Sequence, residues 1–307
     1  MKKYILLFIS VLALFSCKKD AQITATSSSK MAFQFQFDAT QARLNNLGKP
    51  AVLPAGNAAQ TPDFKQLSVH YIELAQDKFT LLGKGAIVYK GAEVTKNGEN
   101  AVDFDKAAVS GQNQVFASIS LKDIAPGTYE WVRASVTYQN YDIKFNINGV
   151  PVIGDLKNQS GTVASFVGFN TFLTKIKPKT KELNVNLAKK QGFWAFETSL
   201  ISPYDSYNDI YSGDAPAGAT TVVNPLAATS PVPTGSCVVT GKFLTPLVVT
   251  GKETKDITVT LSFSVNKSLE WKDSNTNGQL DWYADQTKNK NEAIVDMGLR
   301  GLIPSWK

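Results

Sequence analysis

The chain has 307 residues, 43% of them hydrophobic, which is enough to bury the core of one large domain or of two ordinary ones. A net charge of +6, with basic residues scattered rather than gathered beside aromatic ones, argues against a nucleic-acid partner. With one histidine and two cysteines, the composition excludes a histidine-based zinc site and a disulfide-rich scaffold.

Residues 1–16 have the layout of an export signal. Two lysines precede an apolar run, Tyr4–Phe15, that is too short to span a bilayer. The segment from Leu14 to Cys17 (LFSC) resembles the lipobox of Gram-negative bacterial lipoproteins, in which a lipid is attached to the cysteine and the leader is cut before it. The resemblance implies that Cys17 is the acylated first residue of the mature chain. The alternative is an ordinary secretory leader with an incidental cysteine.

The lipid anchor predicts a location in the cell envelope, on the periplasmic or the surface-facing side of the outer membrane. Lys18 stands where some inner-membrane lipoproteins carry aspartate, which favours the outer membrane. Residues 17–30 are predicted to form the anchor and a flexible tether rich in Thr, Ser and Ala. With Cys17 acylated, Cys237 is the only remaining thiol, so no internal disulfide can form.

The first ordered segment is predicted at Met31–Asp38, where three phenylalanines alternate with glutamines as in a strand with one buried face. After a polar loop, Asn45–Pro62, runs of β-branched and aromatic residues alternate with turn residues, and Asn148-Gly149 is a predicted hairpin turn. The other predicted strands in residues 31–202 are Leu67–Leu74, Phe79–Leu82, Ala86–Tyr89, Gln114–Leu121, Thr128–Tyr138, Tyr141–Ile147, Val163–Ile176, Leu183–Leu187 and Phe193–Leu200.

This pattern predicts an all-β fold, with residues 31–202 as the main antiparallel β-sandwich, in one body or two packed lobes. The segment Ile124–Tyr129 (IAPGTY) resembles the turn and strand of immunoglobulin-like and prealbumin-like sandwich domains, where proline fixes φ and glycine accepts a positive φ. Residues 203–236 are rich first in Tyr and Asp, then in Pro and Gly, and are predicted to form a long surface loop.

Residues 237–307 are predicted to complete the sandwich, because about 70 residues are few for a separate β domain. The strands predicted there are Cys237–Phe243, Leu247–Thr250, Asp256–Val265 and Ile294–Ile303.

One polar loop has the spacing of a cation site. The sequence from Asp273 to Asp281 (DSNTNGQLD) resembles the Asp-x-Asn-x-Asn-Gly-x-x-Asp calcium loops of EF-hands, dockerin-like modules and many secreted β proteins. Oxygen ligands at alternate positions can converge on one calcium ion because Gly278 permits a sharp turn. The predicted ligands are Asp273, Asn275, Asn277, the Gln279 carbonyl and Asp281, with Asp285, Glu292 or Asp296 as a further carboxylate.

The alternative is a cation-free hairpin loop held by side-chain to backbone hydrogen bonds. A true EF-hand is not expected, because Ala284 stands where its bidentate Glu would be and no helical pattern flanks the loop.

No catalytic residues are predicted. His70, the one candidate base, lies within a strand pattern, and Cys237 begins another with no neighbouring cation, so both are expected to be structural. A hydrolase with a pair of carboxylates stays an alternative, with Asp205, Asp209 and Glu197 as the candidates.

Aromatic residues are the other candidate ligand surface. A ring face can pack on the apolar face of a sugar, although most aromatic side chains in a β-sandwich belong to the core. The candidates are Trp194 with Phe193 and Phe196, Trp271 with Trp282, and the Tyr/Asp segment comprising Tyr204, Asp205, Tyr207, Asp209 and Tyr211.

The sequence therefore predicts a lipid-anchored, non-enzymatic cell-envelope protein that serves in binding or adhesion, with a glycan or a protein as ligand and calcium as the one candidate cofactor. Two alternatives remain. One is a copper-binding protein, because three segments resemble the periplasmic copper-binding partner of methanobactin uptake: the Phe33-x-Phe35-x-Phe37 strand, the Tyr71–Leu74 strand and the Pro126-Gly127-Thr128-Tyr129 turn. The low content of histidine (one) and methionine (three) argues against copper binding. The other alternative is a carbohydrate-active hydrolase or glycan-binding lipoprotein.

Overall fold

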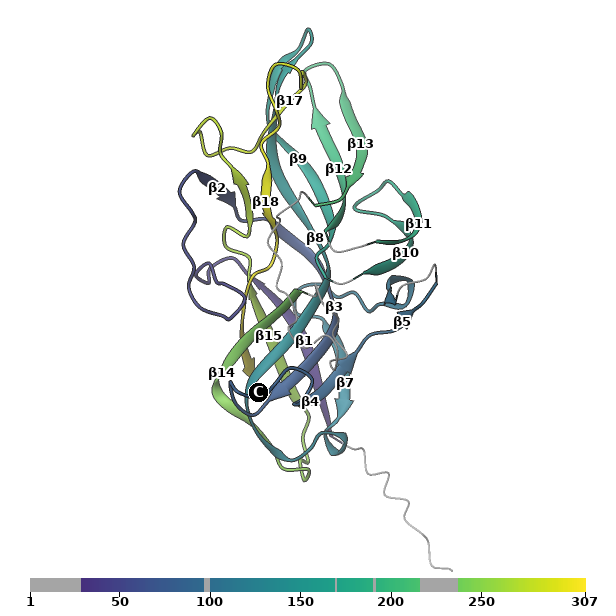
Figure 1. Cartoon of the computed structure of the whole chain (residues 1–307), viewed down its shortest axis with the longest axis vertical. Helices are drawn as coiled ribbons and strands as arrows, with labels where there is room; N and C mark the ends of the chain where they lie inside the picture. The colour runs from purple at the N-terminus through teal and green to yellow at the C-terminus, as the bar shows by residue number, and fades with distance from the viewer. Residues whose placement is uncertain (1–28, 97–99, 169, 190–191, 216–236) are drawn as a thin grey trace, which may run out of the picture.

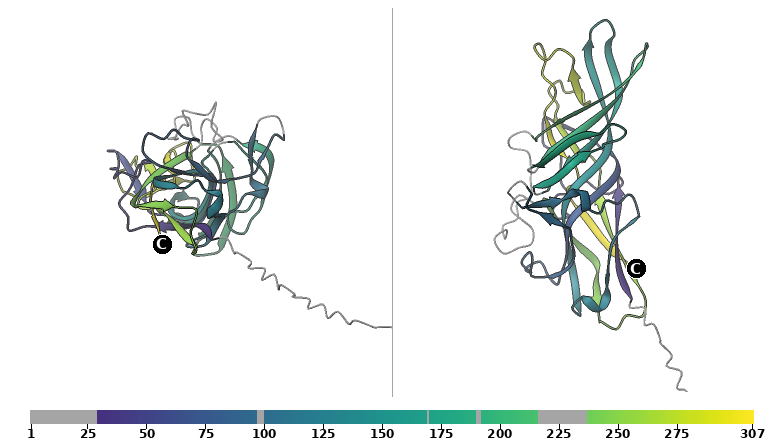
Figure 2. Two further views of the ribbon diagram at one scale, coloured as in Figure 1. Left: turned by 90° about the horizontal axis from the view of Figure 1, so that it is seen from below. Right: turned by 90° about the vertical axis from the view of Figure 1, so that its right-hand side faces the viewer.

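The computed structural model describes residues 29–96, 100–168, 170–189, 192–215 and 237–307, and this part of the chain forms 19 strands and two short 3-10 helices. The predicted all-β fold is confirmed, and the strands form several packed sheets in an elongated molecule (Figures 1 and 2). The lipobox and Cys17 lie outside the described residues. Within the described ranges, no helix has the length and hydropathy needed to cross a membrane.

The largest sheet is built on β8 (Gly127–Val150), which is 24 residues long and joins the lower and upper parts of the molecule (Figure 1). One edge of β8 pairs with β3 (Asp63–Ala75). The other edge pairs first with β14 (Cys237–Val249) and then with β9 (Gly154–Phe166). The sheet continues through β12 (Phe193–Ile201) to β13 (Ser206–Gly213), and β4 (Ala86–Lys90) lies beside β3.

A second sheet packs against the lower half of the first, and the main core lies between them. Its order is β19 (Leu302–Trp306), β15 (Ile257–Ser264), β1 (Lys30–Asp38) and β7 (Val115–Ser120). As the alternation predicts, Phe33 and Phe35 of β1 are fully buried, and the Phe35 ring lies 4.7 Å from that of Phe116 between centroids. Strand β15 pairs in parallel with β1, so strands from both ends of the chain share this sheet.

Two small sheets flank the upper half of the large sheet on opposite sides (Figure 1). Strands β18 (Ile294–Met297), β16 (Leu269–Lys272) and β2 (Asn57–Gln60) form one of them. The other contains β11 (Leu183–Lys189), β10 (Thr171–Ile176), β6 (Ala101–Asp103) and β5 (Glu93–Val94). The short strand β17 (Asp281–Tyr283) pairs in parallel with the upper end of β8. The 3-10 helices are η1 (Phe104–Lys106) and η2 (Leu121–Asp123).

Several predicted strand boundaries are wrong because tertiary contacts override the local pattern. The single strand β8 replaces two predicted strands, Thr128–Tyr138 and Tyr141–Ile147. The polar residues between them stay in the strand because their side-chain amides are hydrogen-bonded. Gln139 donates to the Met297 carbonyl, and Asn140 donates to the carbonyls of Val163 and Pro178. The single strand β14 likewise replaces the two predicted strands Cys237–Phe243 and Leu247–Thr250. Two other predicted strands, Val163–Ile176 and Ile294–Ile303, are each divided into two strands.

Four turns and loops also differ from the prediction. Phe79–Leu82 is not a strand, because the Glu73 carboxylate accepts hydrogen bonds from the amides of Gly83 and Gly85 and holds this loop against the sheet. Asn148-Gly149 lies inside β8, and the hairpin turn follows at residues 151–153. The predicted loops contain strands as well: β2 lies within Asn45–Pro62 and β13 within residues 203–236, of which 216–236 lie outside the described residues.

Candidate functional site

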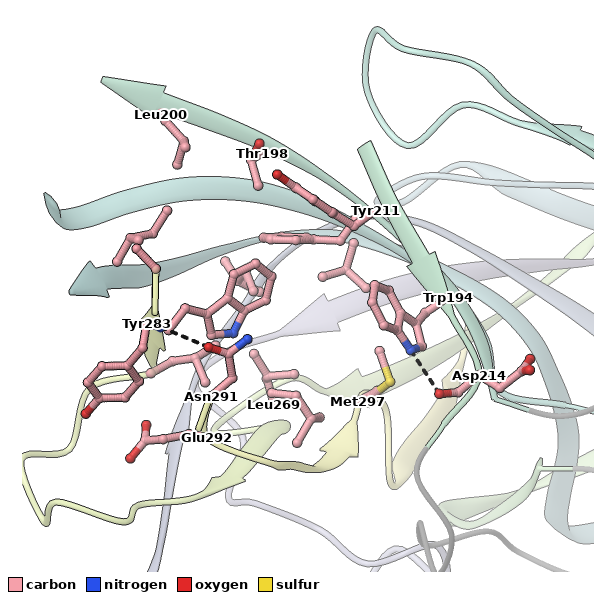
Figure 3. Close-up of a pocket in the computed structure, with 18 residues that line it drawn as sticks. Trp194, Thr198, Leu200, Tyr211, Asp214, Leu269, Tyr283, Asn291, Glu292 and Met297 are labelled. Carbon is pink, nitrogen blue, oxygen red and sulfur yellow. Dashed lines mark hydrogen bonds between the residues drawn. The ribbon is translucent and has the colours of Figure 1, made fainter. Parts of the chain in front are cut away.

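A cavity of about 680 Å³ lies between the upper half of the large sheet and the small sheet that contains β16 and β18 (Figure 3). Fourteen of its 18 lining residues are hydrophobic or aromatic. The cavity is lined by Ile143, Ile147, Val163, Trp194, Phe196, Thr198, Leu200, Tyr211, Asp214, Leu269, Leu280, Trp282, Tyr283, Ala284, Asn291, Glu292, Ile294 and Met297.

The wall on the large sheet follows from strand alternation. Trp194, Phe196, Thr198 and Leu200 occupy every second position of β12, so their side chains share the face that borders the cavity (Figure 3). Tyr211 of the edge strand β13 lies opposite Phe196 in the register and adds a second aromatic ring to this face. The Trp194 side chain is held in place, because its indole N–H donates to the Asp214 carbonyl at 3.3 Å.

The opposite wall comes from the small sheet, where Leu269 of β16 and Met297 of β18 border the cavity. Trp282 of β17, which pairs with β8 of the large sheet, also borders it. The Trp282 ring packs against the Phe196 ring at 5.1 Å between centroids. Next to it, the backbone amide of Tyr283 donates to the Asn291 side-chain oxygen at 2.9 Å, a bond drawn in Figure 3.

The polar groups of the cavity are few and carry no positive charge. The polar lining residues are Thr198, Asp214, Asn291 and Glu292, and no Lys, Arg or His occurs among the described lining residues. The carboxylates of Asp214 and Glu292 point away from the cavity (Figure 3). Glu292 is 5% exposed and accepts hydrogen bonds from the backbone amides of Ser274 and Asp281 at 2.8 and 2.9 Å. It therefore connects the cavity wall to the Asp/Asn loop, residues 273–281.

The Asp281 carboxylate is the centre of that loop. It is fully buried and accepts hydrogen bonds from four asparagine amides at 2.7–3.0 Å: Asn146 and Asn148 of β8, and Asn275 and Asn277 of the loop itself. Burial alone would raise the pKa of Asp281, but these hydrogen bonds outweigh it and lower the pKa to about 2. The loop is thus fixed to the upper end of β8.

The other predicted calcium ligands shape the turn. Asp273 accepts hydrogen bonds from the amides of Asn277 and Gly278 at 3.2 and 2.9 Å, and the Asn277 side-chain oxygen accepts one from the Gln279 amide at 2.7 Å. Gly278 has φ of +73°, the positive value that the sequence motif requires. Among the described residues, no three His, Cys, Asp or Glu side chains are grouped as a metal site, and the loop hydrogen bonds resemble the cation-free alternative. Calcium binding stays a prediction.

The Tyr/Asp segment forms the turn into β13 and this edge strand itself, and only one of its five predicted ligand residues reaches the cavity. Tyr211 lines it, whereas Tyr204 is 80% exposed and the Tyr207 hydroxyl donates to Asp209 at 3.2 Å on the outer surface. Asp205 is exposed and accepts a hydrogen bond from the adjacent amide of Ser206.

The candidate catalytic groups are not brought together. His70 is buried in β3, where its Nε2 lies 3.0 Å from a Glu93 oxygen, and burial lowers its pKa. Burial raises the pKa of the Cys237 thiol to about 12. Glu197 is fully buried and accepts hydrogen bonds from the backbone amides of residues 179–181, so its carboxylate is already satisfied.

No family model matches the chain, and no curated protein or solved structure matches it either.

Of the aromatic residues singled out from the sequence, Trp194, Phe196, Tyr211 and Trp282 line the cavity, while Trp271 and Phe193 are buried in the core. Leu269 and Met297 have no distinctive sequence signal, because an apolar residue on a short strand looks the same whether it borders a cavity or fills a core.

Proposed function

We propose that this chain is a lipid-anchored, non-enzymatic protein of the bacterial outer membrane that binds an apolar ligand in the cavity between β12 and β18. The aromatic lining of this cavity is the observation that supports binding. Its volume falls within the roughly 300–1,000 Å³ of small-molecule sites, which are mostly apolar with a few polar groups. A glycan is less suited to it, because its many hydroxyl groups would lose water without enough partners.

A non-enzymatic role is supported by how the charged groups are used. The carboxylates of Asp281, Glu197 and Glu292 each accept several hydrogen bonds from neighbouring amides. The His70 ring of β3 is paired with Glu93 of β5. A general base needs access to the proton that it abstracts, and none of these groups is poised for that role.

The proposed binding predicts that the soluble domain, residues 29–307, enhances the fluorescence of the neutral apolar dye N-phenyl-1-naphthylamine. Met297→Trp should weaken dye binding at least tenfold, because the larger ring fills the cavity. Val152→Trp is the matched control, since Val152 is fully exposed on the β8–β9 turn and should leave binding unchanged. Equal binding by both variants, or no binding by the wild type, contradicts the proposal.

Lipid anchoring predicts that the full-length chain, expressed in a Gram-negative host, fractionates with membranes and begins at Cys17 in mass spectra, with the mass of added acyl chains. Cys17→Ser removes the residue that carries the acyl chains. The protein should therefore move to the soluble fraction, because these chains provide its binding to the membrane. A mature chain that begins elsewhere contradicts this part of the proposal.

We further propose that calcium stabilises the Asp/Asn loop, because the Asn275 and Asn277 side-chain amides both contact the Asp281 carboxylate, and rotation of these amides would turn their oxygens toward an ion beside it. Calcium at about 100 times its Kd should raise the melting temperature by roughly 5 °C. The shift should vanish in Asp273→Ala and persist in Asp123→Ala, a control at an exposed position of helix η2. A melting temperature that is unchanged at millimolar calcium contradicts the metal role.

A further inference from the structure

The polar groups of the cavity differ in whether they are free to bind a ligand. The carboxylates of Asp214 and Glu292 point away from the space (Figure 3). The Thr198 hydroxyl donates to a backbone carbonyl of β13 at 3.2 Å, and the Trp194 indole N–H donates to the Asp214 carbonyl at 3.3 Å. The side chain of Asn291, in contrast, has an NH2 group with no acceptor among the described residues. A ligand can therefore accept a hydrogen bond from this NH2 group.

The Asn291 amide is held in one orientation. Its oxygen accepts hydrogen bonds from the Tyr283 backbone amide at 2.9 Å and from the Gln286 side chain at 2.5 Å. Gln286 is itself oriented, because its oxygen accepts the Asn291 backbone N–H at 3.2 Å and its NH2 group also donates to the Tyr283 carbonyl. A half-turn of the Asn291 amide would place donors against each other. The Asn291 nitrogen is thus fixed on the side away from Tyr283, toward the space between the walls (Figure 3).

The surroundings of this donor favour an uncharged acceptor. No Lys, Arg or His lines the cavity in the described ranges, so an anionic head group would exchange water for a neutral donor. The ionised Asp281 lies close behind this wall, because its backbone amide donates to Glu292, the neighbour of Asn291 in the chain. A carbonyl oxygen costs far less to remove from water than a carboxylate does, and one hydrogen bond satisfies it.

The place of the donor in the cavity indicates how a ligand is oriented. Asn291 is exposed, whereas Leu269 and Leu280, which line the same cavity, are at most 2% exposed. Asn291 therefore lies at the open side of the cavity and the two leucines at its closed end. A ligand whose carbonyl lies beside Asn291 can extend an apolar chain inward, toward the leucines.

From these observations we infer that the ligand is an uncharged apolar molecule with a carbonyl group, as in a ketone, an ester or an amide, whose oxygen accepts a hydrogen bond from the Asn291 side chain. The inference rests on the proposed ligand-binding function and names the ligand class of that same cavity. A net hydrogen bond of this kind changes an affinity by roughly two- to tenfold.

The test uses three probes with the same heptyl chain: 2-nonanone, octanoate, and 2-methyl-1-nonene, in which CH2 replaces the ketone oxygen. Each is titrated into residues 29–307 in competition with N-phenyl-1-naphthylamine. 2-Nonanone should bind at least tenfold more tightly than octanoate. Asn291→Asp keeps an oxygen for the Tyr283 amide but loses the NH2 group, so it should weaken 2-nonanone at least fivefold and leave the alkene and the dye within twofold. Asn289→Asp, the same change at an exposed position outside the lining, should alter none of these affinities.

A measurement on the wild type needs no variant and so does not depend on how Asn291→Asp folds. In nuclear magnetic resonance spectra, the side-chain N–H signal of Asn291 should move downfield when 2-nonanone is added, and not when the alkene is added. Equal shifts with the ketone and the alkene overturn the hydrogen bond.

The outcomes separate this inference from the function on which it rests. If the dye and the ketone bind but Asn291→Asp weakens the ketone and the alkene equally, the Asn291 contact is overturned and the apolar cavity remains a binding site. Octanoate that binds as tightly as 2-nonanone overturns the uncharged ligand class. If neither the dye nor any probe binds, the proposed function itself is wrong.

Discussion

Arg43→Met is expected to lower the free energy of unfolding by about 3–5 kcal/mol, because it leaves a buried carboxylate without its partner. The Arg43 guanidinium is paired with Glu270 of β16, and both side chains are less than a tenth exposed. Arg43 also donates to the carbonyls of Lys267 and Val52 at 3.2 and 3.0 Å, and Asn57 of β2 donates to the same Glu270 carboxylate. This network attaches the cavity wall at Leu269 to the rest of the chain.

Urea unfolding of residues 29–307 measures the effect, and two further variants identify its origin. Arg43→Met with Glu270→Leu should recover much of the loss, because removal of both charges leaves no buried ion unpaired. Lys65→Met breaks an exposed ion pair with Asp63 and should change the stability by less than about 1 kcal/mol. If Arg43→Met costs no more than Lys65→Met, the buried pair is not what holds this wall.

The local pattern of the chain predicts strands well where one face of a strand is buried. In Met31–Asp38 the alternating phenylalanines identify the strand and its buried face, because a period of two has only one structural interpretation. The pattern fails where polar residues are buried. Gln139 and Asn140 look like a turn between two strands, yet both lie in the middle of β8, since carbonyl groups distant in sequence satisfy their amides.

The candidate site is predictable only in part for a similar reason. The rings of Trp194, Tyr211 and Trp282 stand out in the sequence, but nothing local shows that β12 and β18, about a hundred residues apart, face each other across a cavity. The Asp/Asn loop was found from its spacing, because its ligand-type residues lie within one turn. Its connection through Glu292 to the cavity depends on a contact 18 residues away that no motif encodes.

Glu197→Ala should destabilise the protein by roughly 3 kcal/mol, because it removes a buried carboxylate that accepts several hydrogen bonds. The Glu197 carboxylate is fully buried and accepts hydrogen bonds from the backbone amides of Lys179, Thr180 and Lys181 at 2.8–3.0 Å. The Asn208 side chain of β13 donates to it at 3.0 Å as well. Glu182→Ala, which removes an exposed carboxylate paired with Lys175, is the matched control and should have little effect.

The pH dependence of this variant tests the same contacts independently. Burial opposes ionisation of Glu197, but the hydrogen bonds from Thr180, Asn208 and the backbone outweigh it and lower its pKa from 4.5 to about 2. Because the folded state holds the ionised form, the stabilisation by the charge is complete above pH 4.5 and is lost as the pH falls toward 2. The stability difference between wild type and Glu197→Ala, measured by urea unfolding, should therefore be constant from pH 7 to 5 and shrink below that. A difference that stays the same down to pH 2.5 would mean that the side chain stabilises the sheet by packing rather than by accepting these hydrogen bonds as an anion.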